Sequence, residues 1–512
     1  MGTSDRLIVG IDLGTSTSLL ARWQGDHAEV WSMGQTSGSA VMRSVVWFDP
    51  EHPEDPDKVQ VGEVAHRRAS ANPANALYTI KQSMGQDVTL SAAGRAWRPA
   101  EAASHLLRVM REKIERDTQL PIHLAVIATP YAFNHKQNLD TREAARLAGF
   151  RDEAVHLIPE PTAAALAFGL ALKIEPGHKE RMFVFDLGGG TFDITVYQVA
   201  CEADALRMTV LTTGGLARIG GVTFDQELRT WALARFHESE GIALEDVDDR
   251  ERIYATRQLL NAVEEAKHDL TTAAETELSV PNFLGGRHLD LPINRQVFGE
   301  MLAPHLAAIR DAVESCLLRC DLRPAAIDRV LLVGGASSVP AVRSLVREIF
   351  GKEPSAPKNP QQAVVEGAAL YAGMRAGALR GLPKLQFADV VSYPIGVEHG
   401  HGQMDFLIDR DARLPAVSPR RIFSVQNPER PSITIKVRQG NSAVATRNVL
   451  IGRIVEPAVT RAANGRAQVE LQLTVSEENV VAYTLRDLQS EQVRTGMLRM
   501  EGAEGRADAE HS

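Results

Sequence analysis

Two stretches of the chain share one pattern, and this repeat restricts the folds that the sequence can adopt. Residues 9–17 read VGIDLGTST and residues 184–193 read VFDLGGGTFD, so Asp12 and Asp186 lie 174 positions apart (186 minus 12). Each stretch is an apolar strand that runs into Asp-Leu-Gly, then small residues and a second strand pattern. Other strand patterns alternate with helical ones, such as those at 136–148, 255–270 and 339–350. The sequence therefore predicts an α/β fold built twice, with a cleft between its halves.

Glycine-rich hairpin tips of this kind suit phosphate groups. Glycine has no Cβ, so backbone N–H groups can approach an anion closely, and threonine or serine hydroxyls add further donors. Asp12 and Asp186 would supply hard oxygen ligands to the Mg²⁺ that accompanies a nucleoside triphosphate. A third glycine element, LLVGGA at 331–336, precedes a helix pattern. Such a turn lets a flat ligand lie against the backbone, although it is also a common structural device.

The composition is that of a globular protein without a polyanionic partner. The 512 residues are 44% hydrophobic and 24% charged, with a formal net charge of −9. We expect no nucleic-acid role, because a basic field is missing. We also expect no membrane role, since the longest apolar run, at 163–172, is about half of a membrane span. Three cysteines and no signal-peptide pattern favour the cytoplasm.

The pattern changes near residue 379. A glycine- and proline-containing stretch leads into the short apolar piece LQFADVV at 385–391, which is typical of an interdomain linker. Beyond it apolar residues alternate with polar ones, as at 433–438 and 469–475, which predicts a compact antiparallel β domain. We expect a nucleotide-binding domain over 1–379, a linker over 380–390, a β-sandwich over 391–500 and a disordered tail over 501–512.

The three glycine motifs, with EPTAAA at 160–165 between them, closely resemble the 70-kDa heat-shock protein family. The resemblance spans residues 7 to about 500 and implies an actin-like ATPase fold of two ribonuclease-H-like halves, followed by an antiparallel β-sandwich. It implies hydrolysis of ATP to ADP and phosphate with Mg²⁺, and it leaves K⁺ open as a further ion. The phosphate-binding residues that it implies are Gly14, Thr15, Ser16, Gly189, Gly190 and Thr191.

The resemblance also implies catalytic and regulatory residues. Asp12 and Asp186 position magnesium, and Pro130 switches with the state of the nucleotide. An exposed lysine is usually only a solvated charge, so the role of Lys81 rests on the resemblance alone. The catalytic residues that it implies are Lys81, Glu160, Thr191 and Asp193.

The adenosine side matches the family less closely. The residues that correspond to adenosine contacts are Gly221, Glu264, Lys267, His268, Thr271, Gly334, Gly335 and Ser338. His268 and Ser338 stand where the family has adenine-stacking arginines, and Gln361 replaces an aspartate. A neutral imidazole lacks the delocalised guanidinium cation, so we expect weaker adenosine binding.

The β region matches through residues 389–398 and 433–440. In the family, an extended apolar peptide lies in a groove of this domain. The pocket residues that the resemblance implies are Ile395, Val397, Phe423, Ile433 and Ile435. All five could instead be ordinary sandwich core, and for Ile395 and Ile435 the two interpretations are equally open. Gly400 and Gln426 stand where a pair should arch over the peptide, and no helical lid is expected after Met500, so we expect weak, rapidly reversible binding.

The same ATPase fold occurs in sugar kinases and in filament-forming proteins, so the fold alone does not decide function. A kinase should carry a sugar-binding insertion, and a filament protein should end near residue 380. The β region favours an ATP-dependent chaperone that binds and releases extended apolar peptide segments. We expect a monomer that works with a J-domain co-chaperone and a nucleotide-exchange factor. A specialised regulator or scaffold is the alternative, because the linker is less apolar than the family's and His156 replaces an arginine.

Overall fold

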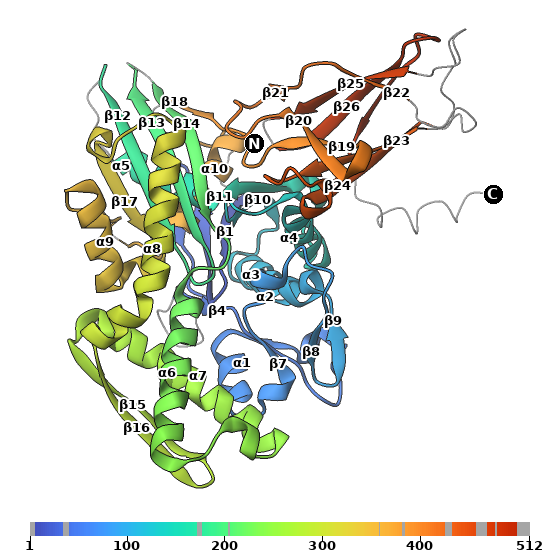
Figure 1. Cartoon of the computed structure of the whole chain (residues 1–512). Helices are drawn as coiled ribbons and strands as arrows, with labels where there is room; N and C mark the ends of the chain where they lie inside the picture. Colours follow the sequence, from blue (N-terminus) through green and yellow to red (C-terminus); the bar gives the residue numbers. More distant parts are fainter. Residues whose placement is uncertain are drawn as a thin grey trace. The chain divides into compact units, whose positions relative to one another are not determined.

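The chain divides into two compact units. The first comprises residues 1–132, 138–208 and 212–386, and the second comprises residues 133–137, 209–211 and 387–512. The computed structural model describes residues 6–33, 40–171, 177–202, 205–357, 359–380, 384–424, 433–456, 468–476 and 479–498 (Figure 1). The expected tail at 501–512, Gln426 of the expected arch and linker residues 381–383 lie outside the described residues. The division at residue 386 falls within the predicted linker.

Two sheets of related topology form the centre of the first unit (Figure 1). The first has the order β11 (Val155–Pro159), β10 (Ile122–Thr129), β1 (Leu7–Leu13), β2 (Thr17–Trp23) and β3 (Ala28–Val30), with β4 (Met42–Arg43) beside β2. The second has the order β17 (Arg329–Val333), β12 (Lys179–Leu187), β13 (Phe192–Cys201), β14 (Ala205–Leu216) and β18 (Lys384–Ala388). In each sheet an antiparallel hairpin, β1–β2 or β12–β13, has a parallel neighbour, β10 or β17. The duplicated α/β fold that the sequence predicts is confirmed.

Several helices begin or end at residues that cap them. Asp248 accepts a hydrogen bond from the backbone of Glu251 at the start of α7, and Asn294 does the same for Val297 at the start of α8. Gly351 ends α9 in the left-handed conformation, with φ 64°. The long helices are α3 (Pro99–Thr118), α4 (His135–Leu147), α5 (Glu160–Ala171), α6 (Gly221–Glu240), α7 (Asp249–Thr272), α8 (Arg295–Arg319), α9 (Pro340–Phe350) and α10 (Ala363–Arg375).

Helix α10 packs against α5 and against β1, and glycines permit both contacts. A Cβ built on Gly367 of α10 would overlap the backbone carbonyl of Ala163 in α5. A Cβ built on Gly10 of β1 would overlap the backbone nitrogen of Ala369 in α10. These backbone contacts fix the helix on the sheet that carries the first glycine-rich tip.

Smaller elements complete the first unit. They are the helices α1 (Gly62–Ala71) and α2 (Ile80–Ser83), the sheet of β5 (Val46–Trp47), β6 (Gln60–Val61) and β7 (Ala76–Leu77), and the hairpins β8 (Leu90–Ala92)–β9 (Arg95–Trp97) and β15 (Glu275–Leu284)–β16 (Arg287–Asn294). Short 3₁₀ turns lie between them, including η3 (Pro73–Asn75) and η7 (Gly335–Ser338). Among the helices of the described ranges, none combines the length and apolar character needed to cross a membrane.

The second unit contains two antiparallel sheets. One has the order β20 (Gln403–Ile408), β19 (Ile395–His399), β23 (Ile433–Gln439) and β24 (Val449–Glu456). The other has the order β21 (Ala416–Val417), β25 (Gln468–Val475), β26 (Val481–Asp487) and β27 (Val493–Met497), with β22 (Arg421–Ser424) also beside β25. Alternate residues of β25 are buried in an apolar cluster that also contains residues of β19 and β23. The predicted β-sandwich is confirmed.

Replacing Gly367 by alanine should destabilise the first unit, because the added methyl group meets backbone that cannot rotate away. Overpacking of this kind costs about 1–3 kcal/mol. Gly299 of α8 provides the matched control, since nothing lies within 4 Å of a Cβ built there. Gly299→Ala should therefore stabilise the protein by about 0.5–1 kcal/mol. Urea unfolding followed by circular dichroism measures both changes, and equal midpoints for the two variants would contradict the close contact of α5 with α10.

Candidate functional site

The two hairpins carry three of the predicted acidic residues, two of them at corresponding places. Asp12 is the last residue but one of β1 and pairs with Leu19 of β2. Asp186 is the last residue but one of β12, and its partner on β13 is Asp193. Each aspartate therefore lies where its strand enters the glycine-rich tip, and the second half carries an acidic pair where the first half has an aspartate and a leucine.

The tips of the two hairpins lie against each other. A Cβ built on Gly189 would lie 2.7 Å from the hydroxyl oxygen of Ser16. A Cβ built on Gly190 would lie 2.7 Å from the hydroxyl oxygen of Thr15. Because a Cβ at either position would come closer than 3.0 Å to a hydroxyl oxygen, a larger residue would displace the neighbouring side chain, which glycine avoids. Hydroxyl groups of the first tip thus face the backbone of the second, an arrangement that can hold phosphate.

The first tip is held in place by Ser44, which sequence reasoning missed. Its hydroxyl donates a hydrogen bond of 2.8 Å to the carbonyl oxygen of Gly14, and its backbone N–H donates one of 2.8 Å to that of Ser16. The Ser44 hydroxyl also lies 2.8 Å from the hydroxyl of Ser18, and both side chains are buried. No feature of the sequence around residue 44 signals this role, because only the fold brings the three serines together.

Lys81 is buried, unlike most lysines. Thr79 precedes α2 in a left-handed conformation (φ 50°, ψ 28°), which turns the chain sharply before the lysine. The side chain of Lys81 is 8% exposed and forms an ion pair with Glu160, the first residue of α5, whose side chain is 12% exposed. A left-handed threonine costs roughly 1–3 kcal/mol, and such strain often occurs at functional sites.

The charges of this region interact strongly. Burial raises the pKa of Asp12 to about 7, with a further rise from Glu160 and an opposing effect from Lys81. Burial and Glu160 likewise raise the pKa of Asp193 to about 7, although the Ala132 N–H lowers it. Burial would lower the pKa of Lys81, but Glu160 and Asp12 outweigh it and raise that pKa above its ordinary value.

Asp186 is affected in the same direction. Burial raises its pKa well above the ordinary value, and the charges of Glu160, Asp193 and Asp12 add to the rise. Four carboxyl groups therefore surround the single ammonium group of Lys81. The site favours binding of additional positive charge.

The donor groups at this site fit a hydrated Mg²⁺ ion. Asp186 Oδ2 and Asp193 Oδ2 are buried without a hydrogen-bond partner among the described residues. A buried oxygen without a partner is unfavourable, and the water shell of a hard cation supplies donors to it. No group of three or more acidic, histidine or cysteine side chains within the described ranges is arranged to bind an ion directly.

The third glycine element lies beside the second tip. Gly334 adopts φ 81°, and a Cβ there would lie 2.7 Å from Asp186 Oδ1. Gly335 begins η7, and Ser338 at its end is exposed. A Cβ on Gly221 of α6 would lie 3.4 Å from Lys267 Nζ. The glycines predicted to contact the nucleotide therefore come from elements that lie around one region.

The predicted adenosine residues of α7 have differing surroundings. Lys267 is paired with Asp225 of α6 at 2.7 Å. The side chain of His268 is 65% exposed and lies 4.0 Å from Glu264. The Thr271 hydroxyl donates to the carbonyl oxygen of His268 at 2.6 Å. Lys267 is therefore held by an ion pair, whereas the exposed imidazole of His268 is open to a ligand.

Side chains of α7 contact segments of the first unit that are distant in sequence, and the sequence analysis did not predict these contacts. Arg43 forms ion pairs with Glu264 at 3.1 Å and with Glu63 of α1 at 3.3 Å. The guanidinium of Arg257 lies 3.8 Å from the centre of the Tyr78 ring, a cation–π contact. Because these partners are far apart in sequence, no spacing in the chain could have indicated them.

The predicted switch residue is connected to the acidic site through its neighbours. Pro130 follows β10 directly and is buried. Two residues later, the Ala132 N–H donates a hydrogen bond of 2.9 Å to Asp193 Oδ1. A movement of the segment after β10 would therefore change the environment of Asp193.

The five predicted peptide-binding residues lie in one apolar cluster of the second unit. Ile395, Val397 and Ile435 are 1%, 0% and 5% exposed, so they are core residues. Phe423 and Ile433 are only partly buried and pack against that core. Of the five, Phe423 and Ile433 retain surface that a bound peptide could contact.

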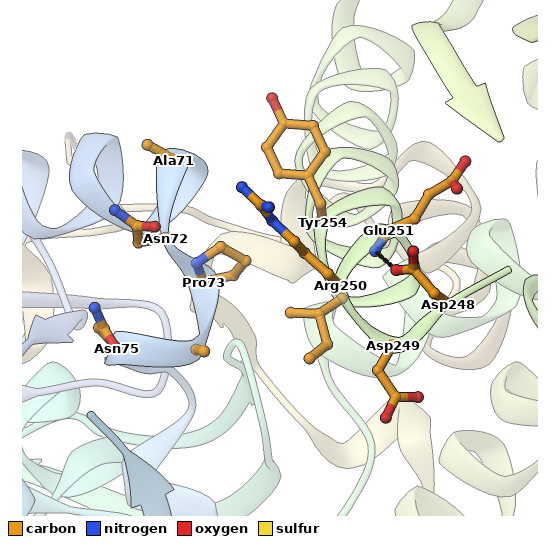
Figure 2. Close-up of a pocket in the computed structure, with 11 residues that line it drawn as sticks. Ala71, Asn72, Pro73, Asn75, Asp248, Asp249, Arg250, Glu251 and Tyr254 are labelled. Carbon is orange, nitrogen blue, oxygen red and sulfur yellow. Dashed lines mark hydrogen bonds between the residues drawn. The ribbon is translucent and has the colours of Figure 1, made fainter. Parts of the chain in front are cut away.

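A cavity of about 700 Å³ lies apart from the glycine-rich tips, between the α1–η3 segment and the start of α7 (Figure 2). Its acidic side chains already have partners: Asp248 accepts from the Glu251 N–H at 2.8 Å, and Glu251 accepts from the Gly285 N–H at 2.9 Å. None of the residues that line it belongs to the predicted phosphate or metal set. The cavity is therefore not the candidate site.

Comparisons with known proteins agree with this geometry. The family model described as "Hsp70 protein" matches residues 8–511. The chain is 31% identical to the chaperone protein DnaK of Thermosipho melanesiensis over 95% of its own length and 79% of the relative's. It is 32% identical to the chaperone protein DnaK of Thermotoga petrophila, with 96% and 80% of the two chains covered.

The stability of the ligand-free protein should fall as the pH rises. The folded chain binds protons at Asp12 and Asp193 more tightly than the unfolded chain, in which their pKa is about 3.8. Their stabilising contribution is complete below pH 3.8 and is lost as the pH rises through about 7. Asp12→Asn should remove part of this loss and stabilise the protein at pH 8 by a few kcal/mol, at about 1.4 kcal/mol per pKa unit.

Thermal unfolding in a chelator at pH 5.5 and 8 measures the effect. Glu54→Gln, at an exposed carboxylate, serves as the control and should follow the wild type at both pH values. An Asp12→Asn protein that loses as much stability as the wild type between these pH values would contradict the raised pKa.

Proposed function

Since the chain belongs to the Hsp70 family of ATP-dependent chaperones, which are ATPases, we propose that the Lys81–Glu160 pair and the aspartates around it form its hydrolytic centre. The observation that carries the proposal is the buried ion pair among three aspartates whose pKa values are raised. Buried groups whose pKa values are perturbed by burial and by specific charged neighbours are typical of catalytic sites. Family members bind ATP and ADP, and the facing tips supply the phosphate-binding surface.

Hydrolysis in this site would depend on positioning and charge stabilisation. A water molecule attacks the terminal phosphorus, the bond to the bridging oxygen breaks, and ADP leaves with the electron pair of that bond. Asp193 Oδ2, buried and without a partner among the described residues, accepts a hydrogen bond from the water. Its pKa of about 7 suits it to hold the released proton briefly before the proton passes to phosphate or solvent.

Lys81 and Glu160 have complementary tasks in this proposal. The Lys81 ammonium lies beside the charge that develops on the phosphoryl oxygens. Glu160 holds the lysine in place and helps to order the water. Thr191, whose side chain lowers the pKa of Asp193, adds a donor from the second tip. Mg²⁺ near Asp12 and Asp186 would neutralise phosphate charge, and K⁺ is a further ion that the site could use.

The adenosine end of the site would bind the nucleotide more loosely. The exposed His268 and Ser338 offer a stacking ring and a small hydroxyl instead of guanidinium groups. Gly334 and Gly335 supply the backbone surface against which the purine lies. We expect affinity to come mainly from the phosphates.

The second unit would bind extended apolar peptide segments. The partly buried Phe423 and Ile433 are the residues that the peptide meets first, with the buried Ile395, Val397 and Ile435 forming the base of the pocket. Backbone hydrogen bonds supply affinity and the pocket selects a leucine-like side chain. A monomeric protein in the cytoplasm, served by a J-domain co-chaperone and a nucleotide-exchange factor, accords with this activity.

Removing the charge of Lys81 should stop hydrolysis while leaving nucleotide binding in place. Single-turnover hydrolysis by Lys81→Met should fall by roughly 100-fold or more. The single change leaves the Glu160 carboxylate buried without its partner and could unfold the site. The double variant Lys81→Met/Glu160→Gln removes that buried charge as well, so it shows whether unfolding causes the loss of hydrolysis. Both variants should still bind ADP by calorimetry, and wild-type turnover in either would refute the proposed centre.

Filling the pocket should abolish peptide binding. Ile433→Phe adds bulk where the peptide side chain enters, and fluorescence anisotropy with a leucine-containing peptide should show no saturable binding. The matched control is Val455→Phe on the neighbouring strand β24, where the side chain is 57% exposed and the added ring meets solvent. Retained affinity in Ile433→Phe, with a native circular dichroism spectrum, would rule out this pocket.

A further inference from the structure

Gln82 follows the buried lysine and lies at the contact between the two tips. A Cβ built on Gly190 would lie 2.9 Å from Gln82 Nε2 and 2.7 Å from the Thr15 hydroxyl oxygen. The amide nitrogen and the hydroxyl therefore converge on one point of the second tip. Gln82 comes to this point because the left-handed Thr79 turns the chain into α2.

The carboxamide of Gln82 is available to a ligand. The residue is exposed, and its backbone is already engaged, since its N–H donates to the Thr79 carbonyl at 2.9 Å and its carbonyl accepts from Gln86. Within the described part of the chain, no hydrogen bond of the Gln82 amide group is found. An amide N–H₂ group readily donates hydrogen bonds to phosphate oxygens.

We propose that Gln82 binds the terminal phosphoryl group of ATP through Nε2 and thereby distinguishes ATP from ADP. The inference rests on the proposed function, in which the phosphates lie between the two tips. The terminal phosphate must lie near Lys81, which stabilises its reaction, and Gln82 is the next residue of the same short helix. ADP lacks this group, so the contact exists only with the triphosphate.

A purely structural role for Gln82 makes a different prediction. If its amide only supports the contact between Gly190 and Thr15, its loss weakens ATP and ADP binding equally and lowers stability. If it binds the terminal phosphate, only the triphosphate complex is affected. The ratio of the two affinities therefore separates the roles.

The test is calorimetric binding of ADP and of a non-hydrolysable ATP analogue, each with Mg²⁺, to the full chain. Gln82→Ala should weaken binding of the analogue by about tenfold or more, the size of a hydrogen bond to a charged group. Gln82→Glu should weaken it further, because a carboxylate repels phosphate. Binding of ADP should change by less than about twofold in the alanine variant, given that ADP lacks the contacted group.

Gln86→Ala is the matched control. It removes a carboxamide from the same segment, whose nitrogen donates to the backbone carbonyl of Gln82 at 2.7 Å. It should leave both affinities unchanged. Equal losses for ADP and the analogue in Gln82→Ala, or wild-type affinity for both, would overturn the inference while leaving the proposed function intact. Failure of the wild type to bind either nucleotide would refute the proposed function itself.

Discussion

The ion pair of Lys81 with Glu160 is the interaction around which the first unit is organised. One ammonium group is surrounded by Glu160 and three aspartates in a region from which water is largely excluded. Burial of these carboxyl groups is unfavourable, repulsion among their charges adds to it, and the raised pKa values express this cost. The ligand-free site is therefore in a state that a bound cation relieves, because the cation brings the positive charge that these carboxyl groups lack.

Rigid packing behind the site makes that strain possible. Helix α10 is in backbone contact with β1 at Gly10 and with α5 at Gly367. Helix α5 begins with Glu160, and β1 ends beside Asp12. The same close contact thus fixes the strand that carries one acidic residue and the helix that carries the other. A looser arrangement would let the carboxylates move apart and would lower their affinity for a shared cation.

The sequence predicted what depends on short-range patterns. The strands, the glycine tips and the register of Asp12 and Asp186 follow from apolar runs and from glycine. The burial of Lys81 could not be predicted, because it depends on a left-handed Thr79 and on Glu160 from a distant helix. Ser44, Arg43 and Gln82 were missed for the same reason. In the second unit, the alternation of apolar and polar residues predicted the strands. It did not predict that Ile435 is buried whereas Ile433 is only partly buried.

The two halves of the first unit have similar strands but different chemical groups. The first half contains Lys81 and Glu160, whereas the second contains the facing pair Asp186 and Asp193. Neither half alone holds both the Lys81–Glu160 pair and the Asp186–Asp193 pair, so the proposed hydrolytic centre requires both halves. The two halves therefore depend on each other despite their similar strand orders. A substitution in the outer part of one half leaves the other half unchanged, whereas a substitution at the facing tips affects both.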